Sequence, residues 1–257
     1  MVNQIVSASM TKADLYRERL GVLAHWDAYL LEQSGLPGPR GNLELAQVVA
    51  DLGDEQLFRR YLACTPDAAP TNSPYEFLAF CGVVGLGRLL AEGDRRDLSE
   101  LRRHASDPRW RLREAVAMAL QRWGDADMQA LLAEMQAWVH GSPLEQRAAA
   151  AGLCEPRLLV QPAHTRAVLS ILESITAAFE KAPLPRSAEF TVLRKGLGYC
   201  WSVAVVALPG EGKPLLEKWL ACTDKDIRWI MGENLKKARL ERMDSIWVMA
   251  MRREHGY

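Results

Sequence analysis

Apolar residues recur every three or four positions along most of the chain, the spacing that places them on one face of an α-helix. This pattern predicts helices or amphipathic segments over 15–31, 43–52, 55–64, 75–91, 125–140, 162–181 and 212–222. Turn-forming residues separate them, most densely at Ser34-Gly35-Leu36-Pro37-Gly38-Pro39. No stretch shows sustained alternation of apolar and polar positions with β-branched residues, as a half-buried strand does. The pattern therefore predicts an all-α fold.

A short frame recurs in this pattern: an Arg with small or apolar residues three and seven positions after it, preceded by an apolar residue except in the copy at Gln146-Arg147. Its copies have their arginines at Arg113, Arg147, Arg194 and Arg228. A helix-capping signal precedes three of the copies, at Asp107-Pro108, Ser142-Pro143 and Asp224. Successive arginines are 34, 47 and 34 residues apart, and the long interval contains the breaker run 182–185. The frame predicts a repeated unit of two helices.

The frame resembles HEAT repeats, whose units are pairs of antiparallel helices with an Asp and an Arg near the start of the second helix. The resemblance extends over 97–240 and is fainter over 43–92. It implies a right-handed α-α superhelix, or solenoid, of about five HEAT-like helix pairs with atypical capping helices at its ends. We expect one such domain over 15–257 and a flexible N-terminus over 1–14. The resemblance also implies that six repeat positions tie neighbouring units together: Asp107, Arg113, Arg147, Arg194, Asp224 and Arg228.

Composition excludes several classes of protein. Lys and Arg number 32 and so do Asp and Glu, so the formal net charge is zero and a uniformly basic nucleic-acid coat is excluded. The most apolar run noted, 201–208, is too short to cross a bilayer, and the N-terminus lacks the features of a secretory leader. Five Cys without a Cys-x-x-Cys pair indicate small buried residues in a reducing compartment. We expect a cytoplasmic protein that does not bind a membrane.

Catalytic and metal-binding motifs are missing from the sequence. There is no dinucleotide or phosphate-binding glycine motif, no nucleophile elbow and no zinc-protease motif. The glycines and lysine of 209–214 lack the Ser or Thr of a phosphate loop, and Pro214 favours a turn between repeats. The five His are dispersed, which disfavours zinc. We therefore name no catalytic residue, metal ligand or cofactor, and expect a protein that is not an enzyme.

A nucleic-acid function is the alternative. The chain also resembles, in architecture, HEAT-like DNA glycosylases that remove alkylated bases; their concave face is basic and presents Trp residues with one Asp near the damaged nucleotide. In this sequence Asp107 and Trp110 are close together and partly match that combination of Trp and Asp, but Asp107 is predicted to cap a helix. The residues that could contact a ligand or nucleic acid lie in two basic stretches: Arg102, Arg103, Arg109, Trp110, Arg111, Trp229, Lys236 and Lys237.

The sequence analysis thus favours a non-catalytic HEAT-repeat scaffold that binds a macromolecular partner on its concave face. A protein or peptide is the expected partner, because the zero net charge contrasts with the basic groove that a duplex binder needs. DNA binding or DNA-alkylation repair of the glycosylase type is the alternative. A continuous positive groove with exposed Trp would favour nucleic acid, and a mixed or apolar groove would favour a protein.

Overall fold

The computed structural model describes residues 10–257, and within them every regular element is helical. This confirms the prediction of an all-α fold. The helices are α1 (Lys12–Val22), α2 (Asp27–Gln33), α3 (Leu43–Leu52), α4 (Glu55–Leu62), α5 (Pro74–Ala91), α6 (Leu98–His104), α7 (Trp110–Ala126), α8 (Met128–Trp138), α9 (Pro143–Leu153), α10 (Pro162–Glu180), α11 (Ala188–Ala207), α12 (Pro209–Leu220), α13 (Lys225–Leu235), α14 (Ala238–Met243) and α15 (Ser245–His255), with a 3₁₀ turn at Pro156–Leu159.

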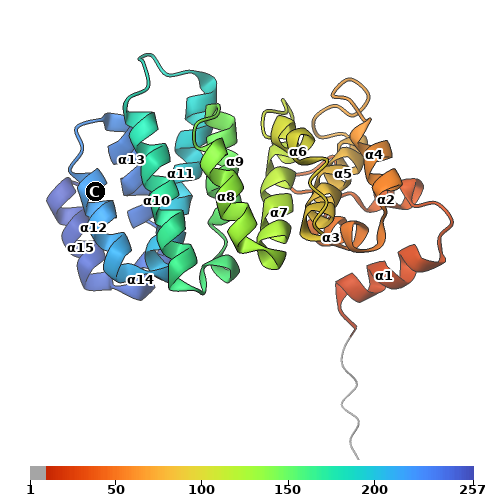
Figure 1. Ribbon diagram of the computed structural model, residues 1–257, viewed down its shortest axis with the longest axis horizontal. Helices are drawn as coiled ribbons and strands as arrows, with labels where there is room; N and C mark the ends of the chain where they lie inside the picture. The colour runs from red at the N-terminus through yellow and green to blue at the C-terminus, as the bar shows by residue number, and fades with distance from the viewer. Residues whose placement is uncertain (1–9) are drawn as a thin grey trace, which may run out of the picture.

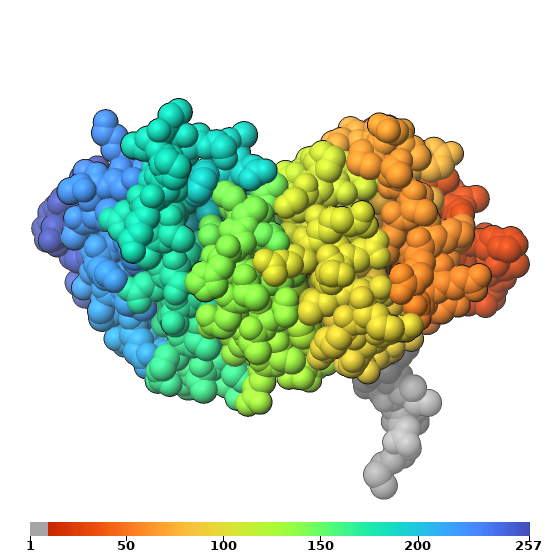
Figure 2. Space-filling view, turned by 45° about the horizontal axis from the view of Figure 1, so that its top comes forward, coloured from red at the N-terminus to blue at the C-terminus, as the bar shows by residue number. Residues whose placement is uncertain are grey.

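Helices from α3 onward contact one another in a regular order. Each odd-numbered helix from α3 to α13 packs against the next odd-numbered helix, while α8, α10 and α12 contact one another in a second row. Helices α6, α8, α10, α12 and α14 also pack against the odd-numbered helices on either side of them, and α4 packs against α5. The chain consequently advances from α1 at one end of the molecule to α15 at the other (Figure 1). In the space-filling view the segments succeed one another in chain order (Figure 2).

Local sequence signals explain where several helices begin. The Ser73 side chain accepts a hydrogen bond from the Glu76 amide ahead of Pro74, and Ser142 with Glu145 forms a reciprocal capping box ahead of Pro143. Asp224 accepts from the amides of residues 226 and 227 at the start of α13. The predicted caps at Ser142 and Asp224 are therefore confirmed, because capping depends only on residues two or three positions away.

Helix α5 is the most enclosed helix of the fold, with fourteen buried residues. An added Cβ at Gly87 would lie 2.4 Å from the Cα of Ala119, so glycine permits α5 and α7 to approach closely. By length and apolar composition Pro74–Ala91 also meets the criteria for a membrane span, but 78% of that window is buried inside the protein. The helix predicted over 75–91 is therefore confirmed, although its 18-residue window, and not 201–208, is the apolar run long enough to meet these criteria.

Two predicted boundaries are wrong. The helix expected over 15–31 is divided into α1 and α2, and Trp26 between them donates its indole N–H to the carbonyl of Leu20. The turn expected over 209–214 is instead the beginning of α12. Pro209 stands where a helix tolerates proline, and Gly212 lies against Val205 of α11, where an added Cβ would approach within 2.7 Å of its Cα.

The N-terminal prediction concerns residues that are only partly described. Residues 1–9 of the segment expected to be flexible, 1–14, lie outside the described residues. Beyond them, Thr11 caps α1 through a capping box with Asp14, so 12–14 form its first turn. The expectation of a single domain over 15–257 stays a prediction.

Candidate functional site

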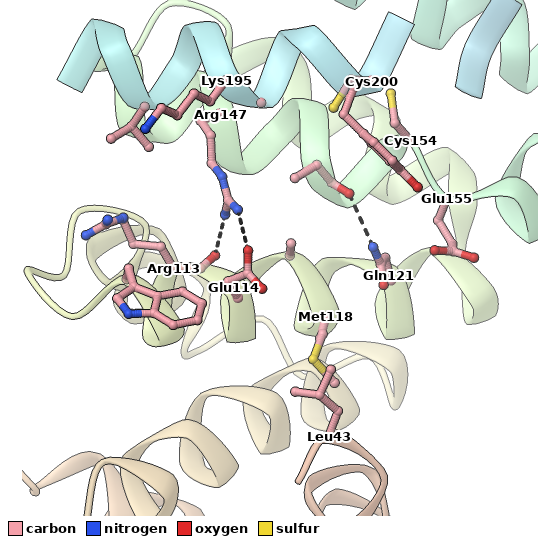
Figure 3. A pocket seen from close by; sticks show the side chains of 16 residues that line it. Leu43, Arg113, Glu114, Met118, Gln121, Arg147, Cys154, Glu155, Lys195 and Cys200 are labelled. Atoms are coloured by element: carbon pink, nitrogen blue, oxygen red, sulfur yellow. Dashed lines mark hydrogen bonds and ion pairs between the residues drawn. The ribbon is translucent and has the colours of Figure 1, made fainter. Parts of the chain in front are cut away.

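A groove of about 510 Å³ crosses α7, α9 and α11 (Figure 3), and no residue of α6, α8, α10 or α12 lines it. Most of its lining comes from these three helices, and Leu43 at the start of α3 completes it. The lining residues are Leu43, Trp110, Arg113, Glu114, Ala117, Met118, Gln121, Arg147, Ala151, Cys154, Glu155, Val192, Lys195, Gly196, Tyr199 and Cys200. The groove is therefore built by segments that are far apart in the sequence.

Large apolar side chains are exposed along this groove. Leu43, Trp110 and Tyr199 are 44%, 41% and 46% exposed. A neighbouring hollow of about 330 Å³ shares Leu43, Trp110 and Glu114 with the groove and extends it toward Arg40 and Phe80. Apolar side chains that remain exposed together mark a surface suited to a partner or ligand.

The positively charged residues of the lining lie together at one end of the groove. Arg113, Arg147 and Lys195, from α7, α9 and α11, lie at this end, whereas Cys154 and Cys200 lie at the other (Figure 3). The backbone of Gly196 makes room for Arg147, because an added Cβ there would lie 3.2 Å from the Cγ of Arg147. We call Arg113, Arg147 and Lys195 the cationic end of the groove.

Arg147 joins two helices at the cationic end. It donates to the backbone carbonyl of Arg113 and to the Glu114 carboxylate, both at 2.9 Å. Arg113 itself donates to the carbonyls of Asp107 at 2.6 Å and Pro108 at 3.1 Å. Burial, followed by the charge of Arg147, lowers the pKa of the Arg113 guanidinium. Both arginines are thus held in place by the fold while they line the groove.

The opposite end of the groove holds two thiols. Cys154 and Cys200 are buried and interact with each other, and burial raises the pKa of the Cys154 thiol well above its usual value. A protonated, buried thiol is a poor nucleophile. Gln121 at this end donates to the carbonyl of Ala151, so it also serves the contact between α7 and α9.

The remaining repeat positions lie outside the groove. Arg194 pairs with Asp226 and lies over the Trp229 ring, 4.2 Å from its centroid, so it ties α11 to α13. Asp224 caps α13 and accepts from Arg186. Arg228 is exposed, and among the described residues its side chain donates a single hydrogen bond, to the carbonyl of His255 at 3.2 Å.

Asp107 has a different role from the predicted cap. Arg109 is the N-cap of α7, while Asp107 accepts the amide and two guanidinium hydrogen bonds of Arg109. Burial alone would raise the pKa of Asp107, but the hydrogen bonds from Arg109 and His104 outweigh it and hold the pKa below its usual range. Asp107 therefore fixes the loop before α7 rather than capping the helix.

Two of the predicted ligand contacts are enclosed by the protein. The side chain of Arg109 is 3% exposed and also donates to the carbonyls of Cys64 and Ala69. Arg111 is 6% exposed and donates to the fully buried carboxylate of Glu76 at 3.1 Å. Both arginines are used to hold loops against α7. Trp110, which lies between them in the sequence, is exposed in the groove.

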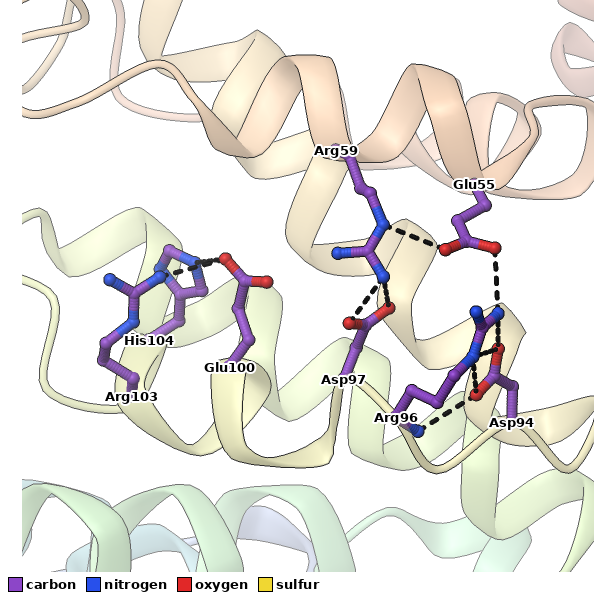
Figure 4. Close-up of polar contacts among 8 residues, drawn as sticks. All are labelled: Glu55, Arg59, Asp94, Arg96, Asp97, Glu100, Arg103 and His104. Carbon is purple, nitrogen blue, oxygen red and sulfur yellow. Dashed lines mark hydrogen bonds and ion pairs between the residues drawn. The ribbon is translucent and has the colours of Figure 1, made fainter.

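The other basic residues of this stretch are also paired. Arg102 pairs with Glu145, and Arg103, which is 72% exposed, pairs with Glu100 at 2.9 Å. Figure 4 shows the neighbouring ion pairs between α4 and the segment leading into α6, in which Arg96 contacts both Asp94 and Glu55. Hydrogen bonds from Arg96 lower the pKa of Asp94 to about 2. The local excess of Arg in the sequence is therefore largely neutralised in space.

The predicted ligand contacts near the C-terminus, Trp229, Lys236 and Lys237, have different surroundings. Lys236 is exposed and pairs with Glu233 at 2.6 Å. Lys237 precedes α14, and within the described residues no carboxylate lies within 4.0 Å of its amino group. Trp229 is half-buried beneath Arg194. None of these three residues lines the groove.

The nearest approach to an acid–base pair is outside the groove. His104 Nδ1 lies 3.5 Å from a carboxylate oxygen of Asp107, and both residues are buried. His104 Nε2 is buried and lacks a hydrogen-bond partner, so this pair has no surface at which a substrate could bind. Residues 10–257 contain no cluster of three or more His, Cys, Asp or Glu arranged to hold a metal ion.

Comparison with protein-family models, curated proteins and solved structures finds no match to the chain. The candidate site therefore rests on its own geometry. Three residues of the groove were predicted from the sequence, Arg113 and Arg147 as repeat positions and Trp110 as a possible ligand contact. Lys195 and Tyr199 were not predicted. A signal for Lys195 was present, because it directly follows the predicted repeat position Arg194 and therefore projects from an adjacent part of the surface of α11.

Proposed function

We propose that the chain is a HEAT-like helical solenoid whose groove binds an extended segment of a partner protein without catalysing a reaction. The observation that carries the proposal is the groove itself. Three exposed apolar side chains converge there with charges of both signs. The order of contacts among the odd-numbered helices supports the repeat interpretation.

The lining favours a polypeptide over nucleic acid. A nucleic-acid strand carries a negative charge at every phosphate and needs cations along its whole path. Among the lining residues the cations lie at one end of the groove, while Glu155 and the thiols of Cys154 and Cys200 lie at the other. A protein segment can match such a surface, because apolar, polar and acidic side chains can follow one another in its sequence.

The groove offers no evident route to catalysis. Burial raises the pKa of the Cys154 thiol and so keeps it protonated, and the carboxylates of Glu114 and Glu155 are engaged by Arg147 and Arg157. The buried Asp107–His104 pair lies outside the groove lining. These features support a binding function, and the proposed localisation is cytoplasmic, in keeping with the unpaired cysteines.

A second candidate is a nucleic-acid function of the glycosylase type. One observation favours it: Trp110 is exposed in the groove four residues before Glu114, whose carboxylate is held by Arg147. An aromatic ring and a carboxylate in a concave site resemble the arrangement of the HEAT-like glycosylases. Release of a modified base from an alkylated duplex, absent with Glu114→Gln, would establish this candidate in place of peptide binding.

Selection from a displayed library of random dodecapeptides tests the proposal directly. We expect the parent protein to enrich peptides that lose binding when Met118 in the middle of the groove is replaced by Arg. Ile246→Arg is the matched control, because Ile246 is an exposed apolar residue of α15 outside the groove. Failure to enrich peptides, or enrichment that survives Met118→Arg, would contradict the proposal.

A further inference from the structure

The cationic end of the groove brings together three positive charges from three helices. Arg113, Arg147 and Lys195 line the same end, and Glu114 is the acidic residue beside them (Figure 3). Glu155, the other carboxylate of the lining, lies at the opposite end and pairs with Arg157 at 3.0 Å. This end therefore carries a surplus of positive charge.

The partners of the three cations are unequal. Arg147 is neutralised by Glu114. The hydrogen bonds of Arg113 go to backbone carbonyls only, and in residues 10–257 neither Arg113 nor Lys195 has a carboxylate oxygen within 4.0 Å. Lys195 is exposed, and its side-chain amino group donates no hydrogen bond within the described part of the chain. Two cations are thus free to contact an anion.

The environment of Arg113 makes an anion favourable there. Its side chain is partly buried and lies close enough to Arg147 for the two charges to repel, and both effects disfavour its charged form. A carboxylate at this point would offset both effects through charge-assisted hydrogen bonds.

Trp110 and Leu43 line the neighbouring hollow together with Glu114, the acidic residue beside the cationic end, and both leave apolar surface exposed. A ligand whose anionic group reaches Arg113 therefore also needs an apolar group that covers Trp110 and Leu43. An acidic side chain next to a large aliphatic or aromatic residue meets both conditions. A nucleic-acid strand could stack a base on Trp110, but its following phosphates would meet no further Lys or Arg of the groove lining.

We propose that the cationic end anchors the side-chain carboxylate of an Asp or Glu in the partner segment, adjacent to a large apolar residue that packs on Trp110 and Leu43. This inference rests on the proposed function. It deepens that proposal by naming the part of the partner that the groove recognises. Arg113 and Lys195 donate to the carboxylate, and Arg147, held by Glu114, contributes charge without moving.

The probe is the tightest-binding peptide from the dodecapeptide selection, compared with a version in which its acidic residues are replaced by Asn or Gln. We expect the acidic peptide to bind the parent about tenfold more tightly, as expected for a charge-assisted hydrogen bond. Lys195→Glu and Arg113→Gln should each reduce this preference to about twofold or less. Raising the salt concentration should weaken the acidic peptide more than the neutral one.

Arg253→Glu is the matched control, because Arg253 is exposed in the last turn of α15 and the substitution changes the net charge as much as Lys195→Glu does. It should leave the preference intact. Lys195→Glu separates binding from folding, since the exposed Lys195 amino group makes no hydrogen bond or ion pair within residues 10–257. Melting curves identify any variant that does not fold.

Three results would overturn the anchor: selected peptides without acidic residues, equal binding of the acidic and neutral peptides, or a preference that persists in both Lys195→Glu and Arg113→Gln. In each case peptide binding that is lost with Met118→Arg would leave the proposed function standing. If peptides bind but Met118→Arg has no effect, or if none is enriched, the proposed function fails together with the anchor.

Discussion

The arginines of 95–111 and the cations of the groove differ in what they contact. In the first region Arg96, Arg102, Arg103, Arg109 and Arg111 each lie within 3.1 Å of a carboxylate oxygen. In the second, Arg113 donates to backbone carbonyls and Lys195 makes no ion pair in the described residues. Only two positions in the sequence separate Arg111 from Arg113.

This contrast teaches that the density of basic residues along a chain does not locate a positive surface. On helix α7, Arg111 points toward the buried Glu76 and Arg113 toward the groove, since two residues correspond to about half a turn. Paired and buried arginines stabilise the fold, whereas unpaired arginines at a groove remain available to a ligand. Four predictions test this division, in order of decreasing effect on stability.

The largest effect should follow Arg111→Met. The substitution leaves the fully buried Glu76 carboxylate without its cation and also removes hydrogen bonds to Gly38 and Asn72. We expect a loss of about 3–5 kcal/mol in the free energy of unfolding, measured by urea denaturation. Combining it with Glu76→Leu should recover part of that loss. A loss below about 1 kcal/mol would show that the pair does not hold the region together.

Acid should destabilise the protein partly through Asp107. Because its pKa in the folded state is lowered, folding favours the charged carboxylate, so this stability is present above the unfolded pKa of about 4 and is lost as the pH falls below it. Asp107→Asn should remove on the order of 2 kcal/mol at neutral pH and flatten the dependence on acid. Melting temperatures between neutral and acid pH measure this, and a parallel acid dependence in both proteins would contradict it.

A smaller effect should follow Arg147→Ala. Arg147 connects α9 to α7 through one carbonyl and one partly exposed carboxylate, so we expect a loss of about 1–2 kcal/mol in the free energy of unfolding. Arg147→Lys should restore the charge but not both hydrogen bonds. A loss as large as that of Arg111→Met would place Arg147 with the buried arginines instead.

The smallest effect on stability should follow Lys195→Glu and Arg228→Ala. Lys195 has no ion pair among the described residues, and Arg228 makes one exposed hydrogen bond with its side chain. Each free energy of unfolding should stay within about 0.5 kcal/mol of the parent value. The two variants should differ in binding, because only Lys195 lines the groove. A marked destabilisation by Arg228→Ala would support the connecting role implied by the HEAT resemblance.

The sequence by itself determined that the chain is helical and where several of its helices begin. Ser73 and Ser142 cap helices through amides three residues away, and the spacing of apolar positions marks the buried faces. These signals are local, so a single chain displays them without its fold. The wrong prediction of a turn over 209–214 also came from a local signal. Its glycines are typical of a turn, but Gly212 instead allows α12 to pack closely on Val205.

The tertiary structure alone decided which charges are paired and where the groove lies. Arg111 finds Glu76 35 residues away, Arg102 finds Glu145 43 residues away, and Arg109 holds the carbonyl of Cys64, 45 residues before it. A side chain's partner at such a separation depends on how helices pack, which local periodicity does not encode. The repeat spacing placed Arg113 and Arg147 in equivalent positions, but only the packing of α11 against α9 brought Lys195 and Tyr199 to the same groove.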